Sequence, residues 1–260
     1  MVRITSADNP LVRRLRRLAD SPRACRESLR SIAEGVHLVE GALAAQVPVT
    51  AVVVSADATA AARALAERAA GACGTRVTEL AQPLYDSIAP VEHGTGVLIE
   101  IAIARPPLPS GLAADAMYLD GVQDPGNAGT LLRIAAAAGV RHVAAATGTA
   151  FLWAPKVLRA AMGAHFALSI YEDVPPPQLA AAFRAERLAA DAGGDEALFT
   201  ASWGAGPTVW MFGSEGQGLG SATLDSAQRR LRIPIDPAAE SLNVAAAAAV
   251  CLFEQRRRRG

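Results

Sequence analysis

Three short segments in the second half of the chain combine glycine, proline and small polar residues. They read DPGNAGTLLR at 124–133, FGSEGQGL at 212–219 and IPIDPAAESLNV at 233–244. Each segment lies where a predicted strand gives way to a loop or helix, which is where open α/β sheets bind ligands. Three junctions of this kind in one domain predict a single composite binding site.

The first segment has a composition suited to binding an anion. Pro125, Gly126 and Asn127 predict a tight turn, and residues 129–139 predict an alanine-rich helix. The free N–H groups and the positive dipole end at the start of a helix attract negative charge. Arg133 stands alone in this apolar helix, so its charge needs either solvent or a phosphate. A turn, a capping side chain and a solvated arginine explain the same residues equally well.

The other two segments do not decide a function when each is taken alone. Gly216, Gly218 and Gly220 lack the spacing of a dinucleotide fingerprint, and no Walker lysine follows them. They predict a loop that lets backbone approach a ligand, with Glu215 as its only charge, although an ordinary surface loop is the simpler interpretation. In the third segment, Ser241 or Asn243 is the expected N-cap of a long helix, and capping alone explains both residues.

The elements that must position these segments alternate between strand and helix. A proline-rich connector at 105–113 predicts two α/β domains, 1–104 and 114–260. The second domain is expected to hold a mostly parallel sheet with covering helices. In the first domain the predicted helices are 10–19, 36–45 and 58–70, with strands at 49–54 and 97–103. In the second, strands are predicted at 117–119, 142–145, 166–170, 208–212 and 231–233, with a final helix running to residue 257.

The composition excludes several classes of protein. No apolar run is long enough to span a bilayer, and residues 1–20 do not have the pattern of a secretory signal, so a cytoplasmic protein is expected. Cys25, Cys73 and Cys251 are far apart and form no C-x-x-C pair, which argues against a disulfide framework or a metal site. The net charge is zero, but residues 1–30 contain eight arginines and only three acidic residues.

This local excess of arginine is concentrated on a predicted amphipathic helix. Leu11, Leu15 and Leu18 fall on one face of the helix, and Arg13, Arg16 and Arg17 fall on the other. The three arginines are therefore candidates for binding an anion such as phosphate. A solvated helix that packs its leucines inward explains the pattern equally well.

Taken together, the three segments resemble the motifs of the SpoU-type (TrmH-like) RNA 2′-O-ribose methyltransferases of the SPOUT superfamily. Asn127 and Arg133 match the first motif, Glu215 and its glycines match the second, and Ser241 and Asn243 match the third. The stretch KVLRAAMGAHF at 156–166 resembles another family segment. The front half resembles the RNA-binding domain of two-domain members, which is similar to small ribosomal proteins. This resemblance makes Arg13, Arg16 and Arg17 the candidate RNA contacts.

The resemblance implies a fold, a cofactor and an assembly. The fold is a small N-terminal α/β RNA-binding domain and a C-terminal α/β SPOUT domain with a deep trefoil knot, which periodicity would not have predicted. The cofactor is S-adenosyl-L-methionine, no metal is implied, and members are homodimers with the site at the subunit interface. The cofactor-binding residues carried over by motif are Gly213, Leu219, Ile233 and Leu242.

In the reaction that the resemblance implies, a ribose 2′-hydroxyl attacks the methyl group of the cofactor, and we hypothesise a role for each motif residue. Arg133 would hold the phosphate and hydroxyl of the target nucleotide, and a phosphate oxygen is one candidate to accept the proton. Ser241 and Asn243 would orient the nucleotide, while Asn127 and Glu215 would shape the pocket. Ribosomal RNA is favoured over transfer RNA as the substrate.

Other functions stay open at this stage. The chain could modify transfer RNA, or methylate a base nitrogen, although the motif pattern favours ribose. A non-catalytic RNA-binding protein of the same fold would be expected to lose Arg133 or Asn243, and both are present. A nucleotide-dependent enzyme would need a phosphate fingerprint that the chain lacks.

Overall fold

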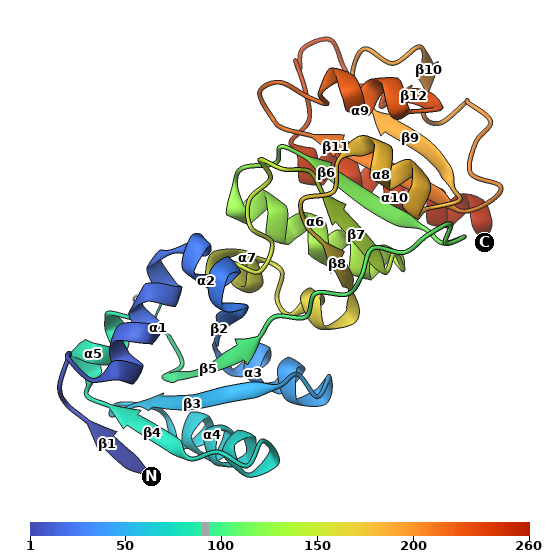
Figure 1. Cartoon of the computed structure of the whole chain (residues 1–260). Helices are drawn as coiled ribbons and strands as arrows, with labels where there is room; N and C mark the ends of the chain where they lie inside the picture. The colour runs from blue at the N-terminus through green and yellow to red at the C-terminus, as the bar shows by residue number, and fades with distance from the viewer. Residues whose placement is uncertain (90–93) are drawn as a thin grey trace. The chain divides into compact units, whose positions relative to one another are not determined.

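The computed structural model of the chain describes residues 1–89 and 94–260, which form two compact units (Figure 1). The first unit contains Met1–Ala104 together with Trp153–Phe166, and the second contains Arg105–Leu152 and Ala167–Gly260. The first unit thus ends beside the predicted connector. The sequence did not predict that Trp153–Phe166 would belong to it.

The first unit is built on a five-stranded sheet in the order β1-β4-β3-β5-β2. Strand β5 runs antiparallel to both of its neighbours, and the other pairs are parallel. The strands are β1 (Val2–Ile4), β2 (Arg30–Glu34), β3 (Val49–Ser55), β4 (Val77–Leu80) and β5 (Val97–Ala102), and the helices are α1 (Pro10–Asp20), α2 (Pro22–Ser28), α3 (Val36–Ala44), α4 (Ala60–Ala72), α5 (Gln82–Asp86) and α7 (Pro155–Ala160). The short elements β1, β2, β4, α2 and α5 were not predicted.

Helix α1 begins where the sequence predicts, because Asn9 caps it and Pro10 occupies its first turn. The side-chain oxygen of Asn9 accepts a hydrogen bond from the Leu11 N–H at 2.9 Å. The buried face contains Val12, Leu15 and Leu18. The predicted apolar face included Leu11, which is only half-buried. Val12 takes its place on the buried face.

Segment Trp153–Phe166 joins the first unit through packing against its sheet and helices. The Ser31 hydroxyl on β2 donates a hydrogen bond to the Trp153 carbonyl at 2.6 Å. The ring of Phe166 lies so close to Gly41 of α3 that an added Cβ there would be 3.2 Å from it. These contacts depend on tertiary packing, which explains why the linear sequence did not reveal them.

The second unit contains a seven-stranded sheet in the order β10-β12-β9-β11-β6-β7-β8. Every recorded strand pair in it is parallel, as the sequence predicts for most of the sheet. The strands are β6 (Ala116–Asp120), β7 (His142–Ala145), β8 (Ser169–Tyr171), β9 (Glu186–Ala190), β10 (Glu196–Ala197), β11 (Thr208–Gly213) and β12 (Arg229–Arg232), and the helices are α6 (Pro125–Ala138), α8 (Pro176–Ala182), α9 (Ser221–Ser226) and α10 (Val244–Arg259).

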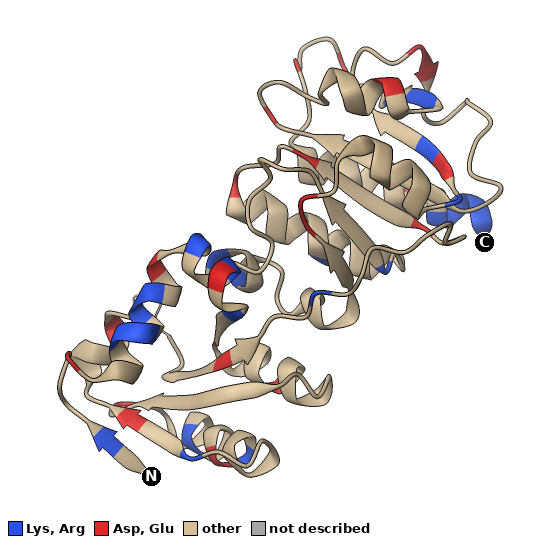
Figure 2. Cartoon of the chain, viewed as in Figure 1, with Lys and Arg blue, Asp and Glu red and all other residues tan. Residues whose placement is uncertain are grey.

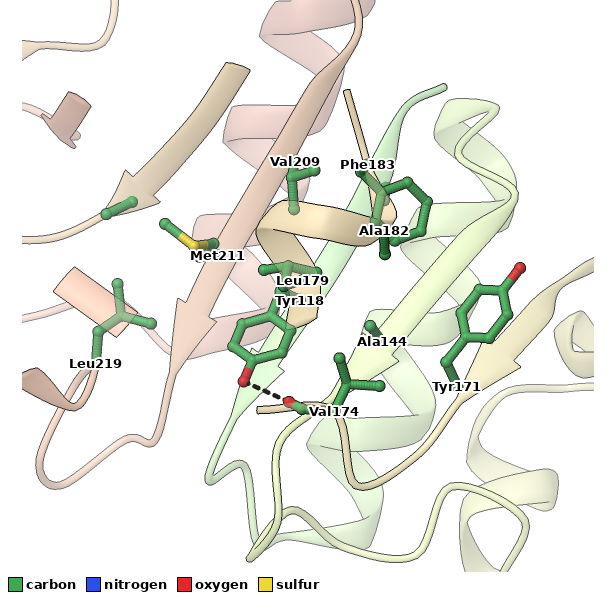
Figure 3. Close-up of a cluster of buried hydrophobic side chains, with 12 residues drawn as sticks. Tyr118, Ala144, Tyr171, Val174, Leu179, Ala182, Phe183, Val209, Met211 and Leu219 are labelled. Carbon is green, nitrogen blue, oxygen red and sulfur yellow. Dashed lines mark hydrogen bonds between the residues drawn. The ribbon is translucent and has the colours of Figure 1, made fainter. Parts of the chain in front are cut away.

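Both faces of this sheet are covered, which suits a parallel sheet. Tyr118 and Met211 contribute to a buried cluster with Leu179 of α8, and the Tyr118 hydroxyl donates to the Val174 carbonyl at 2.8 Å (Figure 3). On the alternate face, the indole N–H of Trp210 donates to Gln255 of α10 at 2.6 Å.

Several local predictions are corrected by the structure. Asp124 caps α6, so Pro125, Gly126 and Asn127 form the first helical turn and not a separate tight turn. A short helix, α9, follows the glycine loop, where none was predicted. The predicted strand at 166–170 begins only at Ser169, because the 3-10 turn η1 (Ala164–Ala167) precedes it. Strands β9 and β10 were also missed.

Within 1–89 and 94–260, no helix is long and apolar enough to cross a bilayer. The same residues contain no group of three or more histidine, cysteine or acidic side chains arranged to hold a metal ion.

Candidate functional site

The three segments meet through a chain of side-chain hydrogen bonds. Asn127, in the first turn of α6, donates its amide N–H to the carboxylate of Glu215, in the loop after β11. Asn243, the N-cap of α10, donates to the side-chain oxygen of Asn127 at 3.0 Å. These partners are 88 and 116 residues apart in the sequence. The predicted convergence of the three junctions is therefore observed.

Helix capping holds both asparagines in place. The Asp124 carboxylate accepts a hydrogen bond from the Asn127 backbone N–H at 2.7 Å. The Asn243 side-chain oxygen accepts from the backbone N–H groups of Ala245 and Ala246 at 2.9 and 3.3 Å. Capping and the link between segments thus use different atoms of the Asn243 amide. The sequence left Ser241 or Asn243 open as the cap, and the structure selects Asn243.

The glycine loop after β11 folds back tightly on itself. Ser214 and Gly218 exchange two backbone hydrogen bonds, at 3.0 and 2.9 Å. An added Cβ at Gly213 would lie 2.1 Å from the Gly218 carbonyl carbon, so no larger residue fits there. The loop is also tied to the end of β6, because the Gly220 N–H donates to Asp120 at 2.8 Å.

A pocket of about 270 Å³ opens beside this loop. Its wall comes from the end of β9, the loop after β11, the segment after β12 and the start of α10. The lining includes all four predicted cofactor residues, namely Gly213, Leu219, Ile233 and Leu242, together with the predicted Glu215 and Ser241. Because these strands are parallel, their carboxyl ends share one edge of the sheet.

One charged residue of the pocket, Asp191, was not predicted from the sequence. Asp191 follows β9, and its carboxylate pairs with Arg230 at 2.6 Å and accepts the Gly193 N–H at 3.1 Å. The run Leu188–Ala190 followed by Asp191 is itself a strand-to-loop junction. Recognising β9 in the sequence would therefore have pointed to this residue.

The predicted arginines lie outside the pocket and differ in their surroundings. Arg133 is exposed on α6 and makes no hydrogen bond or ion pair with the residues that the structure describes. Arg13 on α1 is likewise exposed and makes none within that part of the chain. By contrast, Arg16 donates to the Ser87 hydroxyl at 2.8 Å, and Arg17 pairs with Glu27 at 3.3 Å.

Comparison with known proteins identifies the class to which this fold and pocket belong. The model of the SpoU rRNA methylase family matches residues 116–253, and that of the MRM3-like substrate binding domain matches residues 9–98. The chain belongs to the SpoU rRNA methylase family.

Individual relatives agree with this placement. An uncharacterized tRNA/rRNA methyltransferase of Synechocystis is 33% identical, with 98% of this chain and 93% of that protein covered. The 23S rRNA (guanosine(2553)-2′-O)-methyltransferase RlmP of Bacillus subtilis is 34% identical over 55% of this chain, which spans 58% of that protein. The AdoMet-bound structure of an rRNA methyltransferase from Sinorhizobium meliloti has a TM-score of 0.85 and 28% identity, covering 98% of this chain and 97% of that one.

Proposed function

We propose that this protein is an S-adenosylmethionine-dependent RNA ribose 2′-O-methyltransferase that acts on ribosomal RNA. The observation that carries this conclusion is the convergence of Asn127, Glu215 and Asn243 beside one pocket. Membership of the SpoU rRNA methylase family supports the reaction class. A relative named as a ribosomal RNA 2′-O-methyltransferase supports the substrate and the atom.

The pocket residues fit the cofactor chemically. Leu219, Ile233 and Leu242 supply apolar surface for an adenine ring, and Gly213 lies where backbone can approach a ligand closely. Among the described residues that line the pocket, the charged side chains are the carboxylates of Asp191 and Glu215, which suit a ligand bearing a sulfonium and an ammonium group. When bound, S-adenosylmethionine supplies the electrophilic methyl group.

The protein's own residues would act mainly by positioning the nucleotide. A ribose hydroxyl is a poor nucleophile near neutral pH, so correct alignment and removal of its proton supply much of the acceleration. The guanidinium of Arg133 makes no hydrogen bond with the described part of the chain, so its donors can hold the phosphate and hydroxyl of the target nucleotide. Ser241 and Asn243 orient the nucleotide, and the hydrogen bond from Asn127 to Glu215 keeps the pocket edge in shape.

We extend the proposal to a deep trefoil knot in the second unit. Strand β12 is separated from β6 by β9 and β11 in the sheet. Asn243 nevertheless bonds to Asn127 at the start of α6, so the segment after β12 must cross the carboxyl ends of β9 and β11. On the way it passes the folded loop after β11. This long return path supports threading of the chain end.

The proposal also includes a homodimer. Helix α10 packs on α6, yet an apolar stripe on α10 is left uncovered. Ala246 and Phe253 are exposed, and Ala249 and Val250 between them are half-buried. These residues follow helical spacing, so they form one continuous face that a second copy of the chain would cover. The expected cytoplasmic location stays a prediction.

Methylation of RNA by the purified protein tests the proposed function. The protein is incubated with radiolabelled cofactor and either deproteinised ribosomal RNA or transfer RNA, and labelled alkali-resistant linkages are mapped. We expect label in ribosomal RNA at ribose. Label in transfer RNA alone would show that the substrate is transfer RNA and not ribosomal RNA. Label on a base would contradict methylation of the ribose 2′-oxygen.

Arg133→Ala tests the role of the exposed arginine. We expect the methylation rate to fall at least a hundredfold, because an unpositioned nucleotide loses alignment, while calorimetry shows unchanged cofactor affinity. Arg184→Ala is the matched control, since Arg184 is also exposed in the second unit. A near-normal rate in Arg133→Ala would remove this arginine from the mechanism.

A further inference from the structure

A buried carboxylate lies beneath the basic helices of the first unit. Glu100 is in the middle of β5, and its side chain is 0% exposed. Burying a carboxylate is unfavourable unless the charge is paired and hydrogen-bonded. Arg14 of α1 donates Nε and Nη2 to the two carboxylate oxygens at 3.1 and 3.0 Å. Arg30 of β2 donates Nη1 at 3.3 Å.

The sheet register explains why these three residues meet. Strand β2 pairs antiparallel with β5, and Ile32 lies opposite Glu100. Side chains directly opposite each other point to the same face, and so do those two residues further along a strand. Arg30 and Glu100 therefore share a face of the sheet. Helix α1 packs against β2 and brings Arg14 to the same carboxylate.

The Glu100 carboxylate bonds to some of the guanidinium nitrogens of Arg14 and Arg30 and leaves the others exposed to solvent. The side chains of Arg14 and Arg30 are 46% and 39% exposed. Two guanidinium groups share one carboxylate, so the cluster retains one positive charge. The remaining guanidinium nitrogens make no hydrogen bond with residues 1–89 or 94–260. Buried bonds thus hold two partly solvated cationic groups in place.

We propose that Arg14 and Arg30, held by Glu100, form a phosphate-binding site for the RNA substrate. A planar guanidinium presents paired donors that match phosphate oxygens. Holding the groups in advance lowers the entropy lost on binding. Basic residues also mark the surrounding α1 and α2 (Figure 2), where Arg13 is exposed and Arg23 pairs with Glu27 at 2.7 Å. This inference rests on the proposed function and names residues that the sequence analysis did not select.

The proposed site makes Arg14, and not Arg16 or Arg17, the main RNA contact expected on α1. Arg13, Arg16 and Arg17 are the RNA contacts expected from the sequence, but Arg16 and Arg17 already have protein partners. Arg17 is paired with an exposed glutamate and Arg16 with an exposed serine, so within residues 1–89 and 94–260 neither guanidinium is held by a buried group. Arg14 differs because both oxygens of a fully buried carboxylate orient it. We therefore expect Arg14 to contribute more to RNA affinity than Arg16 or Arg17.

The salt dependence of RNA binding tests the site. Affinity of the full-length protein for deproteinised ribosomal RNA is measured by fluorescence anisotropy across a series of salt concentrations. For Arg14→Gln and Arg30→Gln, we expect affinity to fall about tenfold at low salt. The slope of log affinity against log salt should become shallower by about one for each lost phosphate contact.

Arg63→Gln is the matched control for loss of charge. Arg63 also pairs with a glutamate in the first unit, at 2.8 Å from Glu79, and its side chain is 32% exposed. We expect Arg63→Gln to keep the wild-type salt slope. Equal losses in Arg63→Gln, Arg14→Gln and Arg30→Gln would mean that only net charge matters, and would overturn the proposal.

Glu100→Gln separates orientation from charge, because the two predict opposite signs. Removing a negative charge beside the RNA would strengthen binding if only charge mattered. Loss of the buried anchor should instead weaken binding at least threefold, and tighter binding would overturn the proposal. Arg14→Lys provides the same test with little change in the core. It keeps the positive charge but loses the paired donors of the planar guanidinium, so binding should weaken. Circular dichroism checks that each variant is folded.

Cofactor calorimetry distinguishes failure of this site from failure of the proposed function. If the wild-type protein binds S-adenosylmethionine and methylates RNA, but Arg14→Gln and Arg30→Gln keep its salt slope, the phosphate site is wrong and the function stands. If the wild-type protein shows neither cofactor binding nor methylation, the proposed function fails. A slope change in Arg14→Gln would then still mark a nucleic-acid site.

Discussion

At the scale of single residues, Asn243 shows how one side chain serves both stability and the site. Its oxygen accepts two backbone N–H groups at the start of α10, while its amide nitrogen reaches Asn127. Asn127 in turn donates to Glu215. The orientation of each amide is therefore fixed by a partner whose role is unambiguous, since backbone N–H groups only donate and a carboxylate only accepts.

Substitutions at Asn243 should separate its two roles. Asn243→Ala removes the cap and should lower the free energy of unfolding by about 1 kcal/mol, as well as reducing methylation. Asn243→Ser keeps a capping oxygen but cannot reach Asn127 in the same way, so stability should stay near wild type while the methylation rate falls. Urea unfolding and RNA methylation are the two measurements. Parallel losses in stability and rate for both variants would contradict the separation.

Gly213 makes a second prediction at this scale. Gly213→Ala would place a Cβ 2.1 Å from the Gly218 carbonyl carbon, so the glycine loop must move. We expect cofactor affinity, measured by calorimetry, to fall at least tenfold because the pocket wall shifts. Gly216→Ala is the control, since a Cβ at Gly216 meets nothing within 4 Å. Similar affinities for the two variants would mean that the close approach is unimportant.

At the scale of elements, the arginine run that ends α10 is engaged in the fold. Arg258 donates to the carbonyls of Leu198 and Ala201 and lies 4.4 Å from the centre of the Trp203 ring. Arg259 pairs with Asp115 at 2.5 Å. From the sequence alone, these arginines are expected to favour the negative C-terminal end of the helix. The structure adds that they fasten the loop before β11.

Glu254 links this helix end to the pH dependence of stability. Hydrogen bonds from Arg257 and then Arg258 lower the pKa of Glu254 to about 2. In the unfolded chain the pKa is about 4.3. Because the folded pKa is the lower one, the ionised carboxylate stabilises the fold above about pH 4.3. That contribution is lost as the pH falls from there towards 2.

Substitution of Glu254 tests this linkage. Glu254→Gln should be less stable than wild type at pH 7, and its free energy of unfolding should vary less with pH between about 4.3 and 2. Urea unfolding at several pH values gives both quantities. Asp225→Asn serves as the control, because Asp225 is exposed in the same unit. If the free energy of unfolding of Glu254→Gln varies with pH below about 4.3 as it does in the wild type, the ion pairs of Glu254 contribute little to stability.

Long periodic elements were predictable from the sequence, whereas short ones were not. The alanine-rich helices and the valine-rich β3 have clear periodicity or strong strand composition, and their predicted positions agree with the structure to within a few residues. Strands β4 and β9 are short and carry charged residues, so their local pattern resembles a loop. Missing β9 also meant missing Asp191, because the residue was not placed at a strand end.

At the scale of the whole molecule, the uncovered stripe on α10 predicts the assembly. Phe253→Asp should convert the proposed dimer to a monomer in sedimentation experiments, because a buried unpaired carboxylate is unfavourable at an interface. Phe199→Asp is the control, since Phe199 is similarly exposed, at 50% against 47% for Phe253. A monomeric wild-type protein, or equal behaviour of the two variants, would contradict the predicted interface.

The sequence by itself determined the α/β class, the family resemblance and the residue types at the pocket. These properties are encoded locally, in periodicity and in motifs of a few residues. Only the tertiary structure decided that Asn127 bonds to Glu215 and Asn243, that Trp153–Phe166 packs with the first unit, and that Glu100 joins Arg14 to Arg30. The physical reason is that strand order and register determine which distant side chains meet. Neither can be read from the sequence immediately around either side chain.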